Sequence, residues 1–302
     1  MKLYIIGNGF DRGHDLPTSY WDFRNYLLKN HPEFLYDFEE NYNIYPSMTD
    51  EEKSKILWKD FEHNLANIKE DEIVSDAVSI DMDLESGPVG IEDTLYYYFQ
   101  KEYKYINKLS KYLKQWVENI CIRDAQPKSS KIIDDAYYLV FNYTSVLEDV
   151  YDISTSHIVH IHGSLNNYDI EPVIGHGNIA RIEQLAQKRY EAELIFDEAQ
   201  LAIYKVLDDY YRETYKDTNR YMHQLSKIPF EKIDEIVVIG HSIAEVDLPY
   251  FSAIDSLTNH ELKWTVFYFN FNEERDLLEN LIKGGISQNR IKIHHSADFY
   301  DL

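Results

Sequence analysis

Residues 5–23 read IIGNGFDRGHDLPTSYWDF, in which a short apolar run passes into a stretch rich in glycine. A dinucleotide-binding fingerprint needs the spacing G-x-G-x-x-G and a helix that starts directly at the turn. Here Gly13 stands one residue too late, and Pro17 would not be tolerated inside a helix. These two departures argue against an ordinary dinucleotide-binding motif. We expect the helix to start near Ser19, with Asp22 as its capping partner.

The glycines of this stretch predict a ligand-binding loop at the carboxyl end of the first strand. Open α/β sheets bind their ligands at that edge, and glycine lets backbone N–H groups come close to a phosphate. Asn8 and Asp11 would add polar side chains to the same crevice. A tight turn that serves no ligand is the alternative, although it does not explain Asn, Asp and His together. The cofactor-binding candidates of this stretch are Gly7, Asn8, Gly9, Phe10 and Thr18.

Short β-rich runs alternate with long helical stretches along the chain. This alternation is typical of an α/β fold with a central, mostly parallel sheet. Several runs are almost continuously apolar, as expected of strands that are covered on both faces. The expected strands are 3–6, 137–142, 157–162, 236–240, 264–270 and 291–294, and the expected helices are 19–30, 50–69, 92–121 and 181–227.

The helices gather in two long intervals between strands. The interval between the first two strands is far longer than the dozen or so residues that a crossover connection needs. We therefore expect a single discontinuous α/β domain over residues 1–302, with helical insertions at approximately 45–130 and 180–228. These insertions could form a lid or a surface for homo-oligomerisation.

Polar residues follow the other strands at the points where they end. Asn142 would lie at one tip, where its amide can donate to a ribose hydroxyl and accept from a water, unless it serves only as a turn residue. His162 ends the next strand and is a general-base candidate. Gly240 and Ser242 could hold a phosphate at a helix start, and Asn270 could bind an adenosine ribose. Polar tips that converge on one crevice predict a nucleotide site more strongly than any single motif does.

The composition excludes several kinds of partner. The 53 Asp and Glu residues outnumber the 30 Lys and Arg residues, and the formal net charge of −23 argues against general nucleic-acid binding. A single cysteine excludes an internal disulfide and fits a reducing compartment. The N-terminal apolar run is too short for a signal peptide, and no apolar run reaches the length of about 18 residues that a membrane-spanning helix needs. We therefore expect a cytoplasmic protein without a membrane partner.

The ordered motifs of the chain resemble those of the AbiH family of bacterial abortive-infection proteins. The resemblance spans nearly the whole chain and lies in residues 5–23 and in four later segments. These segments read WKDFE at 58–62, FNYT at 141–144, HIHG at 160–163 and IGHS at 239–242. The resemblance implies an anti-phage role, with a phage-derived trigger as a candidate partner.

The same motifs are distantly similar to the NAD-binding, Rossmann-related fold of sirtuins. By that similarity the glycine loops would hold the NAD pyrophosphate, and Asn142 and His162 would form the catalytic pair. The four cysteines of the sirtuin zinc module are absent, so no zinc is expected, and Thr144 replaces an aspartate of the nicotinamide pocket. The similarity implies hydrolysis of NAD at the nicotinamide–ribose bond rather than protein deacylation. In this hypothesis Asn142 orders water and ribose, His162 takes a proton, and Asp11 stabilises the developing positive charge.

Two other classes of function stay open at this point. A metal-dependent phosphodiesterase or nuclease would use histidines and acids beside the loop glycines, although no HxxxH or paired-carboxylate spacing occurs. A non-catalytic nucleotide sensor, or a subunit of a toxin complex, would bind the same ligand without turnover. The candidate metal ligands are Asp11, His14, His160, His162, His176, His241 and Asp247.

Overall fold

The computed structural model describes residues 1–70, 106–165 and 169–301, which form two compact units. Unit 1 comprises Met1–Phe23, Leu113–Val173 and Asp217–Leu302, and unit 2 comprises Arg24–Tyr112 and Ile174–Lys216. Both expected helical insertions overlap unit 2. The expected single discontinuous domain stays a prediction.

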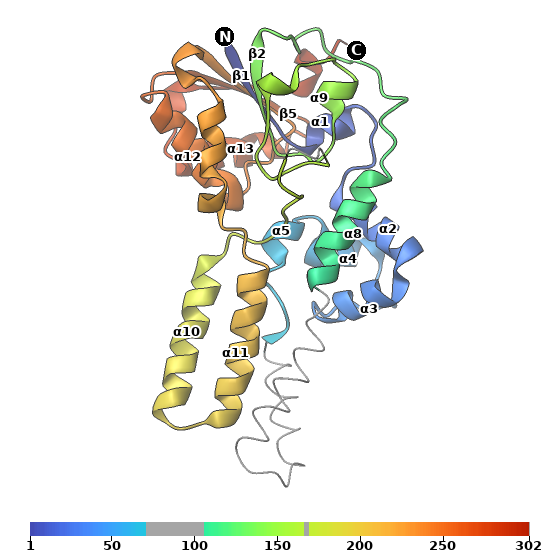
Figure 1. The fold of residues 1–302 in the computed structure, drawn as a ribbon, viewed down its shortest axis with the longest axis vertical. Helices are drawn as coiled ribbons and strands as arrows, with labels where there is room; N and C mark the ends of the chain where they lie inside the picture. Colours follow the sequence, from blue (N-terminus) through green and yellow to red (C-terminus); the bar gives the residue numbers. More distant parts are fainter. Residues whose placement is uncertain (71–105, 166–168, 302) are drawn as a thin grey trace. The chain divides into compact units, whose positions relative to one another are not determined.

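Unit 1 is built on one six-stranded sheet in which every neighbouring pair of strands is parallel (Figure 1). The strand order is β3-β2-β1-β4-β5-β6, which is the order of the doubly wound Rossmann fold. The α/β fold class is therefore confirmed, and a strand is found in each of the six expected places. The strands are β1 (Lys2–Ile6), β2 (Ala136–Val140), β3 (Ile158–His160), β4 (Glu235–Ile239), β5 (Lys263–Tyr268) and β6 (Ile291–His295).

Helices cover both faces of this sheet because successive strand residues point to opposite sides. Leu3 and Ile5 belong to one buried cluster, which includes side chains of α12 (Leu248–Leu257) and α13 (Glu273–Lys283). Tyr4 and Ile6 belong to a second cluster on the opposite face, together with residues of α1 (Asn8–Gly13) and α9 (Val146–Asp149). Figure 1 shows these two pairs of helices on either side of the strands.

The loop after β1 differs from the sequence prediction in one respect. A helix does begin at the turn, because α1 starts at Asn8, but it is only six residues long and ends before Pro17. The next helix, α2 (Tyr20–Asn30), starts where expected. Its predicted cap is confirmed, since the Ser19 N–H donates to Asp22 Oδ2 at 2.9 Å and the Asp22 N–H donates to Ser19 Oγ at 3.2 Å. Because α1 ends before Pro17, the glycine-rich turn can start a helix although the proline would not be tolerated inside one.

Unit 2 is helical in its described part. Its core contains Phe38, Trp58 and Phe61, the last two with stacked rings 4.7 Å apart. The buried pair Arg24 and Glu39 stands beside them at 2.6 Å, and Glu39 also accepts from the Trp58 indole N–H. The helices that lie in unit 2 or enter it are α2, α3 (Pro32–Glu40), α4 (Asp50–Lys53), η1 (Ser54–Trp58), α5 (Phe61–Asn64), α8 (Ile106–Glu118), α10 (Ile179–Leu194) and α11 (Glu198–Glu213).

The predicted helical intervals are more divided than the sequence pattern suggested. The predicted helix 50–69 consists of α4, the π-helical turn η1 and α5, and the interval 181–227 consists of α10, α11 and short 3₁₀ turns. Part of the predicted helix 92–121 lies outside the described residues. Within the described ranges, no helix combines the length and the apolar character needed to cross a membrane.

Candidate functional site

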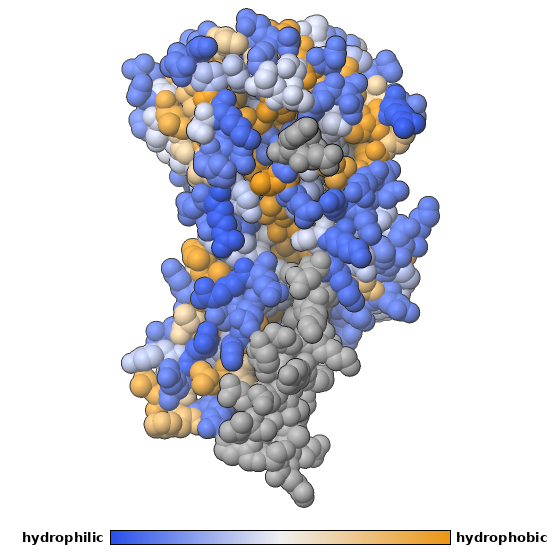
Figure 2. All heavy atoms as spheres, in the orientation of Figure 1, coloured by the Kyte–Doolittle hydropathy of each residue, from blue (hydrophilic) through white to orange (hydrophobic). Residues whose placement is uncertain are grey.

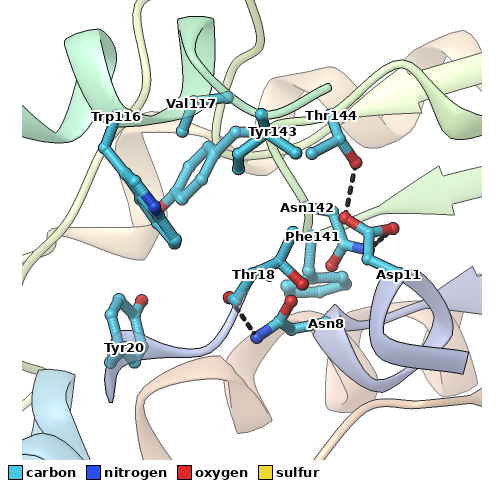
Figure 3. Close-up of a pocket in the computed structure, with 11 residues that line it drawn as sticks. Asn8, Asp11, Thr18, Tyr20, Trp116, Val117, Phe141, Asn142, Tyr143 and Thr144 are labelled. Carbon is cyan, nitrogen blue, oxygen red and sulfur yellow. Dashed lines mark hydrogen bonds between the residues drawn. The ribbon is translucent and has the colours of Figure 1, made fainter. Parts of the chain in front are cut away.

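A pocket of about 410 Å³ lies in unit 1 at the carboxyl ends of β1 and β2. Figure 3 shows Asn8, Thr18 and Tyr20 on one side of the pocket and Trp116 and Tyr143 on the other. Among the described residues, the lining consists of Asn8, Asp11, Thr18, Tyr20, Trp116, Val117, Ile120, Phe141, Asn142, Tyr143 and Thr144.

Asp11 is the only acidic side chain of this lining and is buried, with 1% of its surface exposed. Asn142 Nδ2 donates to its Oδ1 at 2.7 Å, and Thr144 Oγ1 donates to its Oδ2 at 2.5 Å. Burial raises the pKa of Asp11 to about 6, against the lowering effect of these two hydrogen bonds. The carboxyl group can therefore change its charge close to neutral pH.

Two polar oxygen atoms of the same lining are buried without a hydrogen-bond partner. Within residues 1–70, 106–165 and 169–301, neither Asn142 Oδ1 nor Thr18 Oγ1 has a partner. Buried polar atoms are almost always satisfied in native proteins, so such a pair needs an explanation. Both oxygens can accept a hydrogen bond from a donor placed in the pocket, such as a ligand hydroxyl or a water.

The predicted glycines are used for close packing between the β1–α1 turn and the end of β4. The Gly7 N–H donates to Ile239 O at 3.0 Å, and the Gly9 N–H donates to Gly240 O at 2.7 Å. A Cβ atom on Gly7 would lie 2.4 Å from the Cα of His241. These two N–H groups are thus engaged within the protein, and their predicted contact with a phosphate has no support from this geometry.

Asn8, between the two glycines, does line the pocket. Its Nδ2 donates to Thr18 O at 2.7 Å and so ties the start of α1 to the loop before α2 (Figure 3). Phe10, another predicted ligand contact, has no exposed surface and packs in the core on the α1 side of the sheet. Of the predicted residues in this stretch, Asn8, Asp11 and Thr18 reach the pocket.

His162 lies in a neighbouring buried cluster rather than in the lining of the pocket. Its Nε2 is 3.3 Å from Tyr250 Oη and 3.8 Å from Asp247 Oδ1. His241 Nε2 is 3.6 Å from the other carboxylate oxygen of Asp247. Phe141 connects the two places, because it lines the pocket and its ring lies 5.2 Å from that of His162. In the structure, Asn142 is therefore hydrogen-bonded to Asp11, whereas His162 lies beside Asp247.

His160 supports the pocket through a contact with the backbone of Asn142. Its Nδ1 is hydrogen-bonded to the backbone oxygen of Asn142 at 3.1 Å, and its Nε2 to Glu148 Oε1 at 2.9 Å. Burial by itself would lower the pKa of His160, but the hydrogen bond and the charge of Glu148 outweigh it, so the pKa is raised. The resulting imidazolium would sit near Asp11 and would lower the pKa of that carboxyl group.

Ser242 and Asn270 are exposed and do not belong to the pocket lining. The expectation that Ser242 lies at the start of a helix is wrong, because α12 begins only at Leu248. Asn270 instead organises the turn before α13, where its Oδ1 accepts from the Asn272 N–H at 3.1 Å. Sequence reasoning missed Trp116, which reaches the pocket from α8 and has no motif around it.

Three of the candidate metal ligands, His162, His241 and Asp247, lie near one another, but at distances longer than those of metal coordination. Within the described part of the chain, no group of three or more His, Cys, Asp or Glu side chains is placed to hold a metal ion. His14 contacts Phe10 O and Tyr151 Oη at 2.8 and 2.7 Å. His176 belongs to unit 2, and its burial lowers its pKa to about 4. The geometry therefore gives the metal-dependent alternative no support.

Comparison with known protein families gives a match over most of the chain. The family model described as bacteriophage abortive infection AbiH matches residues 3–268, which include every residue that lines the pocket. No curated protein and no solved structure matches the chain.

Proposed function

The chain belongs to the AbiH family of bacteriophage abortive-infection proteins, and from this premise we propose that it hydrolyses NAD at the nicotinamide–ribose bond. The proposed site is the pocket around Asp11 and Asn142. The family places the protein in phage defence, and the loss of a central metabolite is one way in which an infected cell can be stopped. The reaction itself is the proposal.

The observation that carries the proposal is the pairing of a buried acid with unsatisfied acceptors. Asp11 has a pKa of about 6, and Asn142 Oδ1 and Thr18 Oγ1 have no partner within the described ranges. Ribose hydroxyl groups are donors that would satisfy both oxygens. A buried carboxyl group with a perturbed pKa in the lining of a pocket is typical of functional sites.

Cleavage of the nicotinamide–ribose bond requires mainly that the protein position the substrate and stabilise developing charge. Water would add to the anomeric carbon while the carbon–nitrogen bond breaks, and the bonding electron pair would leave with nicotinamide. The ionised Asp11 would stabilise the positive charge that develops on the ribose, and Asn142 would orient the ribose. The proton of the attacking water would pass to a base. The candidate is His162, which lies outside the pocket lining but next to Phe141, with the two ring centres 5.2 Å apart.

The test is product analysis after incubation of the purified protein with NAD, with and without a chelator. We expect nicotinamide and ADP-ribose as products. We expect Asp11→Asn and Asn142→Ala to lower turnover at least about 100-fold, the usual effect of removing a group that stabilises developing charge. Asp15→Asn is the matched control, because this acid lies on the same segment but its side chain is 86% exposed. His162→Ala tests the assignment of the base.

The outcomes separate the competing functions. Unchanged turnover in both Asp11→Asn and Asn142→Ala would remove the proposed site. Binding of NAD without any turnover would identify a nucleotide sensor. Turnover that disappears with the chelator would instead indicate a metal-dependent enzyme.

A further inference from the structure

The turn that joins α10 to α11 in unit 2 exposes three consecutive apolar side chains. Leu194, Ile195 and Phe196 are 60%, 68% and 90% exposed. Figure 2 shows apolar atoms gathered at the end of this helical hairpin, which Figure 1 places at the far end of α10 and α11. We call these three residues the hairpin tip. Contiguous exposed apolar residues are unusual on a protein surface and often mark an interaction site.

The backbone of the tip has a defined conformation. Phe196 has a φ of +57°, in the left-handed region that glycine adopts at lower cost. The Phe196 N–H donates to Glu193 O at 3.2 Å, and the Asp197 N–H donates to Ala192 O at 3.0 Å, so the turn closes the end of α10. Asp197 Oδ1 then accepts from the Gln200 N–H at 3.0 Å and starts α11. The chain therefore bears the conformational cost of a phenylalanine whose ring gains almost no burial.

The charges around the tip restrict what can cover it. The acidic residues that flank it along the chain are Glu191, Glu193, Asp197 and Glu198. A second copy that met the tip head-on would bring like charges together, and an anionic membrane would be repelled for the same reason. A protein surface with an apolar pocket and a rim of Lys or Arg side chains would be complementary in both shape and charge.

We propose that the hairpin tip is a docking element for a protein partner that receives Phe196 in an apolar pocket rimmed by basic side chains. An aromatic anchor surrounded by polar residues is the usual composition of a binding hot spot. The inference rests on the family role in phage defence and does not depend on NAD hydrolysis.

The main test compares Phe196→Gly with the wild type in a host and phage for which the wild type reduces plaque numbers. Glycine suits the positive φ, so we expect the melting temperature of the variant to stay the same or to rise. We expect at least a tenfold loss of protection and unchanged NAD turnover. Phe196→Trp should protect like the wild type. Phe271→Gly is the matched control, because this phenylalanine is 76% exposed in unit 1.

The charge requirement has its own variants. We expect Glu191→Lys combined with Glu193→Lys to lose protection, and Glu183→Lys, an exposed acid earlier on α10, to keep it. Full protection by Phe196→Gly would overturn the proposal. A change in the sedimentation of the purified protein on Phe196→Gly would also overturn it, since it would assign the tip to a second copy. If the wild type lacked NAD turnover, only the proposed reaction would fail, because protection is measured separately.

Discussion

Asp11 is held in an environment that opposes its charge. Its carboxyl group is buried, and the hydrogen bonds from Thr144 and Asn142 only partly offset the loss of hydration, so its pKa lies at about 6 instead of 3.8. A fold selected only for stability would place a neutral residue at such a position. An unfavourable buried charge makes sense when the charge is needed for chemistry, as in active sites that give up stability for activity.

This reasoning predicts that Asp11→Asn stabilises the protein at pH 7. The folded state takes up a proton near pH 6 and the unfolded state near pH 3.8, so the wild type gains stability as the pH falls through this window. At 1.36 kcal/mol for each pKa unit, the charged form costs up to about 3 kcal/mol at pH 7, and the amide removes this cost. Urea unfolding at pH 7 and pH 5 should show a gain that shrinks at the lower pH. A loss of stability at pH 7 would contradict the prediction, and Asp15→Asn controls for the change of net charge.

Among the structural elements, the β1–α1 turn and the end of β4 depend most closely on each other. Gly240 has a φ of +67°, and a Cβ atom there would lie 2.2 Å from the backbone nitrogen of Phe10. Because Gly7 and Gly9 meet the same segment, the pocket-facing Asn8 and Asp11 are positioned by contact between two loops. The glycines thereby place the site even though their own N–H groups point away from it.

We predict that Gly240→Ala is considerably more harmful than Gly285→Ala. Both glycines have a positive φ, but a Cβ atom on Gly285 would meet nothing within 4 Å, so the comparison separates steric overlap from backbone strain. Overlap in packed regions typically costs 1–3 kcal/mol, and we expect Gly240→Ala to lose about that much more free energy of unfolding. Chemical denaturation of the two variants measures the difference. Equal losses would show that the two loops can move apart.

At the scale of the whole molecule, charge is the dominant feature. A formal net charge of −23 creates self-repulsion that opposes the compact state. We predict that the melting temperature rises by several degrees when NaCl is raised from about 0.05 M to about 0.5 M, because salt screens this repulsion. Differential scanning fluorimetry in NaCl and in KCl measures the effect and excludes a specific sodium site. A constant or falling melting temperature would show that favourable ion pairs outweigh the repulsion.

Both units bury charged pairs, and Asp11 differs from them. Unit 2 buries the pair Arg24 and Glu39 at 2.6 Å, and unit 1 buries Asp255 against Arg290 at the same distance. Asp11 instead takes its hydrogen bonds from the neutral side chains of Asn142 and Thr144. Buried pairs with matched partners are typical of structural roles, whereas a buried acid held by neutral donors in a pocket is a candidate for a reactive site.

The sequence by itself determined the positions of the six strands, the α/β class and the cap at Ser19 and Asp22. These features depend on apolar runs, glycine and short polar patterns, all of which act between residues close together in the chain. For the same reason it identified Asn142 as a polar residue at a strand end.

Only the tertiary structure decided which polar residues meet. Asp11 and Asn142 are 131 residues apart, and they touch because β1 and β2 are neighbours in register. The packing of helices on the sheet also brings Trp116 to the pocket from a distant part of the sequence and places His162 beside Asp247. A sequence pattern records which residues can end a strand, whereas strand order and side-chain packing determine which of those ends share a pocket.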